Sequence, residues 1–156
     1  MDELAMAVAA GLMVAGCGMT QVVAPPPGDL AGLQRPSSPN TALAGPPGFL
    51  PAPDLPTRLY ALPPDQLFAV ARGVVAALPR SVELANDVGR RRVDHVVRSL
   101  VFRFPDIVQI QVVPTDGGSA LVVYSYSLIG RSDLGVNRSR VAAILAAVDG
   151  AVPAGS

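Results

Sequence analysis

Residues 130–141, GRSDLGVNRSRV, combine arginines, glycines and an aspartate in a pattern that could bind an anion. Helical periodicity follows this stretch, so its backbone N–H groups would lie at a helix N-terminus, where the helix dipole favours negative charge. Gly130 and Gly135 would let the backbone approach a ligand closely. The candidate anion-binding residues are Arg131, Ser132, Asp133, Gly135, Asn137, Arg138 and Arg140.

The same residues also fit a purely structural corner. Asp133 would cap the helix and pair with Arg131 or Arg138, while the glycines would adopt positive φ. We favour this corner over the anion site because turn and cap chemistry explains most of the residues without a ligand.

A hydrolytic site would depend on His95, the single histidine of the chain. Asp94, Asp106 or Asp133 would orient it beside a serine, but the sequence contains no G-x-S-x-G element. We therefore interpret His95 as a half-buried strand residue. With one cysteine and one histidine, the chain has no ligand set for a multi-cysteine zinc site, and we expect neither a metal nor a cofactor.

Cys17 is the only cysteine, and the residues before it have the features of an export signal. Residues 4–16 are uncharged and fall short of the roughly 20 apolar residues that span a bilayer, as expected for a signal-peptide hydrophobic region. The flank VAGC at residues 14–17 resembles the lipobox of bacterial lipoproteins, whose cysteine thiol accepts a diacylglycerol. We therefore predict lipidation of Cys17, although Asp2 and Glu3 stand where such signals are usually basic. The alternative is a buried cysteine that ends a short uncleaved anchor.

The composition indicates one domain without a strong charge. The chain has 156 residues, with 12 basic and 12 acidic side chains, which favours no nucleic-acid partner. We predict a lipoprotein signal peptide at residues 1–16, a lipidated cysteine and proline-rich linker at 17–58, an α+β domain at 59–150 and a disordered tail at 151–156. The proline-rich segment would be a semi-rigid spacer or a strap across the domain surface.

Hydrophobic periodicity predicts the elements of the domain. An amphipathic helix lies between Pro63 and Pro79, and strands follow at residues 82–88, 91–104, 108–112 and 120–129, with a bulge near residues 98–99 and a hairpin turn at 115–118. A second helix ends at Gly150. The predicted fold is α+β, a four-stranded antiparallel meander with two helices packed on one face, preceded by the extended proline-rich segment.

Three elements of the sequence resemble the bacterial family called domain of unknown function 1499. These are SSPNT at residues 37–41, FRFPD at 102–106 and GRSDLGVNRSRV at 130–141, in the order that the family shows. The resemblance spans roughly residues 36–149 and implies an exported or membrane-associated α+β domain, often a lipoprotein, with no known reaction. The chain departs from the family at Tyr126 and Leu128, where arginines are expected, and at Ile107, where a second acidic residue is common.

These observations predict a lipoprotein of the bacterial cell envelope. We expect it to face the periplasm, anchored through Cys17, and to bind an envelope protein or support envelope structure without catalysis. In a Gram-negative cell, Gly18 favours the outer membrane, because an aspartate at that position commonly directs retention in the inner membrane. The alternative is an enzyme or an anionic small-molecule binding protein with its site at residues 130–140.

Overall fold

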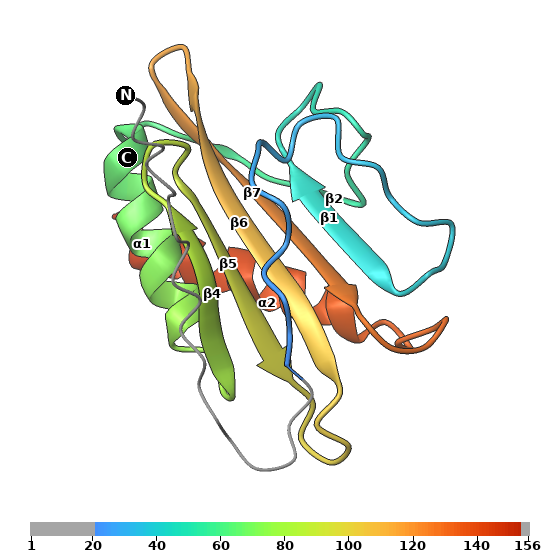
Figure 1. The fold of residues 1–156 in the computed structure, drawn as a ribbon. Coiled ribbons are helices and arrows are strands. Elements are labelled where there is room, and N and C mark those ends of the chain that lie inside the picture. Colours follow the sequence, from blue (N-terminus) through green and yellow to red (C-terminus); the bar gives the residue numbers. More distant parts are fainter. Residues whose placement is uncertain (1–20, 154–156) are drawn as a thin grey trace, which may run out of the picture.

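The computed structural model describes residues 21–153 and has an α+β fold built on one mixed sheet (Figure 1). Its strands are β1 (Thr41–Gly45), β2 (Leu55–Pro56), β3 (Leu59–Tyr60), β4 (Ser81–Asp87), β5 (Arg92–Arg98), β6 (Pro105–Thr115) and β7 (Gly118–Ser127), and its helices are α1 (Pro64–Ala76) and α2 (Val136–Ala151). The strand order is β2-β1-β7-β6-β5-β4, and β3 also pairs with β7. β1 and β2 run parallel, whereas the other paired strands are antiparallel.

The predicted meander forms the larger part of this sheet but not all of it. β4 to β7 follow one another as expected, yet the prediction of four strands was wrong because β1, β2 and β3 extend the sheet beyond β7. β1 has the sequence TALAG, and it fits between prolines without containing one. Its backbone donors are therefore intact, and residues 41–44 pair with residues 123–126 of β7.

The strand predicted at residues 91–104 ends earlier, at Arg98. Residues 99–104 leave the sheet as a loop, which the N–H of Ser99 closes by donating to the carbonyl of Phe104 over 3.0 Å. The expected bulge is also elsewhere, because the register shifts in β4 between Glu83 and Ala85. The hairpin turn at residues 115–118 is confirmed, and Gly117 supplies its left-handed backbone with φ 79°.

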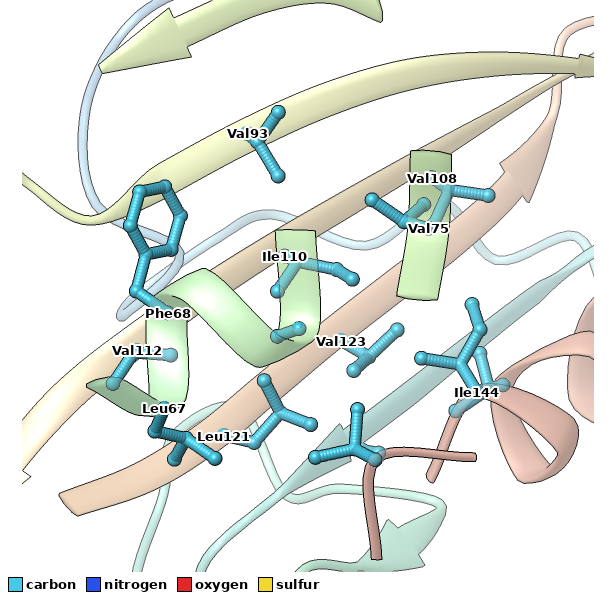
Figure 2. Packing of buried hydrophobic residues seen from close by; sticks show 14 of the residues in the cluster. Leu67, Phe68, Val75, Val93, Val108, Ile110, Val112, Leu121, Val123 and Ile144 are labelled. Carbon is cyan, nitrogen blue, oxygen red and sulfur yellow. The ribbon is translucent and has the colours of Figure 1, made fainter. Parts of the chain in front are cut away.

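The main core lies between the sheet and the two helices. The buried residues of α1 are Leu67, Phe68, Ala71 and Val75, and those of α2 include Val141, Ile144 and Val148. Figure 2 shows side chains of α1 meeting those of β5, β6 and β7. Burying one such large apolar side chain stabilises the fold by about 1.5–3 kcal/mol, so this layer holds the helices on the sheet.

Residues 21–40, which we call the strap, cross the opposite face of the sheet. Leu30 of the strap is buried against Leu43, Val122 and Tyr124. The N–H of Leu30 also donates to the side chain of Gln111 over 2.8 Å. Of the two predicted roles of the proline-rich segment, the surface strap therefore describes these residues.

Candidate functional site

The three sequence elements that resemble the family converge at one end of the sheet. Asn40 stands directly before β1, Asp106 is the second residue of β6, and residues 130–140 run from the β7–α2 loop into the first turns of α2. Hydrogen bonds join side chains from all three elements into one cluster. We call this cluster the signature network, and its members are Asn40, Asp106, Ser125, Ser127, Asp133, Asn137 and Arg140.

Asn137 lies at the centre of the signature network and is fully buried. Its Nδ2 is 3.0 Å from the carbonyl oxygen of Asn40, 2.9 Å from Ser127 Oγ and 2.7 Å from Asp133 Oδ2. Its Oδ1 accepts hydrogen bonds from the hydroxyl of Ser125 over 2.5 Å and from Arg140 over 2.8 Å. Every polar atom of this buried amide therefore has a partner, as a stable interior requires.

Asp133 closes the N-terminus of α2. Its carboxylate accepts the N–H of Gly135 over 2.9 Å and the N–H of Asn137 over 2.7 Å. Burial alone would raise the pKa of Asp133, but the hydrogen bonds from Asn137 and Gly135 outweigh it and hold that pKa below its usual value. The helix end that could have received an external anion thus already receives a carboxylate of the chain.

Arg140 joins α2 to β6. Its Nη2 lies 2.8 Å from Asp106 Oδ2, and the two side chains are only 12% and 8% exposed. The other nitrogen of its fork donates to Asn137 and, over 3.3 Å, to Ser125 Oγ. The guanidinium is thus engaged inside the network.

The remaining candidates of the 130–140 stretch lie outside the network. Arg131, Ser132 and Arg138 are exposed, and Ser132 Oγ accepts only a long bond from the N–H of Leu134 at 3.4 Å. Within residues 21–153, neither Arg131 nor Arg138 pairs with Asp133, so the ion pair expected for the corner does not form. Gly135 is the N-cap of α2, with φ 82°. Cys17 lies outside the described residues.

His95 is held in a separate cluster on the helix-facing side of the sheet. Its side chain is nearly fully buried, Nδ1 is 2.7 Å from Ser81 Oγ, and Nε2 is 3.9 Å from Glu83 Oε2 without a hydrogen-bond partner among the described residues. Burial lowers the pKa of His95, against the opposing effect of the Glu83 carboxylate. The ring is therefore neutral near pH 7. Glu83 itself accepts hydrogen bonds from Arg72.

None of the three predicted orienting carboxylates contacts His95. Asp94 forms an ion pair with Arg92 on the strap side of the sheet, with both side chains under 10% exposed. Asp106 and Asp133 belong to the signature network. The contact with Ser81 was missed, because it depends on the register that pairs Ser81 with Val97 and Glu83 with His95 across β4 and β5.

The described residues form neither a metal-binding group nor a membrane-spanning helix. Within residues 21–153, no group of three His, Cys, Asp or Glu side chains is arranged to hold a metal ion. In that same part of the chain, no helix has both the length and the apolar character needed to span a membrane.

Comparisons with known proteins place the chain in a family. Among solved structures, the crystal structure of Ara h 8.0201 is similar over 61% of this chain and 93% of that chain, with 14% identity and a TM-score of 0.44. No curated protein matches the chain. The family model described as "Protein of unknown function (DUF1499)" matches residues 33–148, which include all members of the signature network. The chain therefore belongs to the DUF1499 family.

Proposed function

We propose that the protein is a non-enzymatic, lipid-anchored domain of the bacterial cell envelope that binds a partner or supports envelope structure. The observation that carries this proposal is the internal pairing of the signature network. Catalysis needs a group that is free to attack a substrate or to exchange a proton with it. In this network the two carboxylates bind an arginine and a helix end, and the central amide is fully hydrogen-bonded.

The network has instead the properties of a latch. It joins the residue before β1 and the start of β6, which are far away in the sequence, to the end of β7 and the first turns of α2. Buried and fully paired polar clusters of this kind fix one arrangement of the elements that they join. This accounts for the family signature without a reaction.

The anchor is proposed from the sequence around Cys17, and the strap limits how far it would hold the domain from the bilayer. The strap is held on the sheet at Gly28, whose carbonyl accepts a hydrogen bond from Arg92, and at the buried Leu30, so residues 18–27 would form the tether. Ten residues span at most about 36 Å when fully extended. The domain would then stay within that distance of the membrane surface.

The anchor is tested with the full chain expressed in a bacterium. We expect processing to stop with globomycin, the mature protein to carry the mass of a diacylated cysteine, and Cys17→Ala to abolish both features. Met19→Ala, which keeps the thiol, serves as the matched control. If Cys17→Ala remains in the membrane fraction with unchanged processing, the lipid anchor is refuted.

An anion site at residues 130–140 is the second candidate, and it rests on the exposed side chains of Arg131 and Arg138. Asp133 already fills the helix N-terminus between them, which weakens this candidate. Calorimetric titration with phosphates, sulfated sugars and acidic lipid headgroups separates the two proposals. No heat of binding at millimolar ligand would eliminate a small-anion site.

A further inference from the structure

Two loops at one end of the sheet carry most of the exposed large apolar side chains. Residues 99–104 connect β5 to β6, and residues 128–136 run from the end of β7 to the first residue of α2; together we call them the apolar tip. Eight of the thirteen large apolar side chains that are exposed within residues 21–153 belong to it. They are Leu100, Val101, Phe102, Phe104, Leu128, Ile129, Leu134 and Val136.

The two loops form one surface because their strands are paired. Asp106 of β6 lies opposite Ser127 of β7, and the N–H of Leu128 donates to the carbonyl of Pro105 over 3.1 Å. Figure 1 shows both loops at the end of the sheet where β5 and β7 finish. The side-chain amide of Asn40 donates to the carbonyl of Gly130 over 2.8 Å, so the signature network also holds the second loop.

The first loop is braced, although its apolar side chains point outward. The N–H of Phe104 donates to Ser99 Oγ over 2.9 Å, and the carbonyl of Phe104 accepts the N–H of Ser99 over 3.0 Å. The rings of Phe102 and Phe104 stack with their centroids 5.4 Å apart, yet Phe102 is 73% exposed. In the second loop, Leu134 is 95% exposed. Exposed apolar patches of this kind usually mark a surface that binds a partner or a membrane.

The charges around the tip select among such partners. Arg103, Arg131 and Arg138 are exposed within or beside the two loops. The acidic groups nearby are bonded within the chain, since Asp106 pairs with an arginine and the Asp133 carboxylate accepts backbone N–H groups at the start of α2. A protruding surface of phenylalanine and leucine with arginines beside them suits the interface of a bilayer, where rings enter the acyl boundary and guanidinium groups meet anionic headgroups.

The start of the described chain lies at the same end of the molecule. Figure 1 shows the beginning of the strap next to the end of β5 and the start of β6. Cys17 precedes residue 21 by four positions, and a fully extended chain covers at most about 14 Å over four residues. A lipid on Cys17 would therefore bring the apolar tip, rather than the opposite hairpins, to the membrane.

We infer that the apolar tip binds the surface of an acidic lipid bilayer, with the side chains of Phe102 and Leu134 in the interfacial layer. This inference rests on the membrane location proposed above and adds a second contact to it, which orients the domain. If a second copy of the chain or an envelope protein covers the same surface, the experiment must distinguish that outcome from binding to lipid.

The chain contains no tryptophan, so a single substitution introduces one fluorophore for the test. The full-length chain, purified from membranes, is reconstituted into phosphatidylcholine vesicles with and without phosphatidylglycerol. F102W and L134W report the two loops. V88W is the matched control, because Val88 is also apolar and 67% exposed but lies on the β4–β5 hairpin at the opposite end of the sheet.

We expect F102W and L134W emission to shift to shorter wavelength on the vesicles and to be quenched several-fold more by brominated acyl chains than V88W emission. Phosphatidylglycerol should strengthen the quenching, and replacing Arg131 and Arg138 by glutamine should remove that gain. Equal and weak quenching at all three positions refutes the inference. A blue shift without quenching by brominated lipid also refutes it, because protein then covers the tip.

The mass of the same purified chains tests separately whether the lipid anchor is present. A diacylated chain that floats with vesicles but shows no F102W quenching refutes the tip and leaves the anchor intact. A chain without the lipid mass whose F102W emission is quenched refutes the anchor and supports the tip. Unchanged thermal unfolding of each variant confirms that the substitutions leave the fold intact.

Discussion

Replacing Asn137 by alanine is the most direct test of the latch. The substitution removes an amide that bonds to one carbonyl, one carboxylate, one guanidinium and two hydroxyl groups. A hydrogen bond contributes about 0.5–1.5 kcal/mol net, or about 1.5–3 kcal/mol when one partner is charged. The lost bonds are not simply additive, because Arg140 and Asp133 keep other partners.

An unpaired buried donor adds to this cost. The hydroxyl of Ser125 is buried and would lose the acceptor of its O–H, at about 1–3 kcal/mol, whereas the carbonyl of Asn40 keeps the N–H of Ser127 as a partner. We therefore expect N137A to lower the free energy of unfolding by about 3–5 kcal/mol. Much of the stability of an ordinary domain, about 5–15 kcal/mol, would be lost.

Urea unfolding of the chain from residue 21 onward, followed by circular dichroism, measures this loss. Ser139→Ala is the matched control, since Ser139 lies on the same helix with an exposed side chain and should change stability by less than about 0.5 kcal/mol. If N137A lowers the free energy of unfolding by less than about 1 kcal/mol, the network is not a latch, because removing a buried and fully hydrogen-bonded amide should destabilise the fold by more than this.

Three further predictions concern single contacts. Arg140→Met should destabilise the fold by about 3–5 kcal/mol because it leaves Asp106 buried without its charge partner, and urea unfolding should show that adding Asp106→Leu recovers part of the loss. Gly118→Ala should unfold several degrees lower in a thermal scan, since its Cβ would lie 1.9 Å from the carbonyl oxygen of Tyr60; an unchanged midpoint would contradict this close approach. The pKa of His95 in the fold lies below its ordinary 6.5, so the unfolded chain binds the proton first and the free energy of unfolding should fall as the pH drops below about 6.5. His95→Gln should flatten that part of the pH profile of the unfolding free energy. Identical profiles for the two chains would rule out this contribution.

The local parts of the fold could be predicted from the sequence, whereas the pairing of distant segments could not. The face of α1 and the turn at Gly117 follow from periodicity and turn chemistry alone. β1 was missed because its small residues carry no alternating pattern and prolines surround it. These residues form a strand because they pair with the edge of β7, which lies about 80 residues away in the sequence.

Residues 99–104 misled the prediction for a related reason. Leu100, Phe102 and Phe104 alternate as in a half-buried strand, and such alternation normally indicates one buried face. In the structure these side chains are exposed and the segment is a closed loop. These side chains are apolar for a reason other than burial in the core, and the proposed contact with lipid supplies that reason.

The candidate site was predicted only in part, because its members differ in how local their contacts are. Asp133 caps α2 through residues two and four positions away, so helix-start chemistry was enough to suggest its role. Arg140 binds Asp106, 34 positions away, and no spacing rule in a single sequence connects them. Resemblance to the family marked both segments, but only the folded arrangement shows that they pair.

The latch and the apolar tip are physically linked. The buried amide of Asn137 bonds to the carbonyl of Asn40, and the side chain of Asn40 donates to the carbonyl of Gly130 at the start of the second loop. One chain of hydrogen bonds thus runs from the interior to the exposed loop that carries Leu134. A loop that presents apolar side chains to water would otherwise tend to fold them inward, since each buried side chain is favoured by about 1.5–3 kcal/mol. Fixing its base to a satisfied polar cluster opposes that collapse, and this explains why the signature combines internally paired polar residues with an exposed apolar loop.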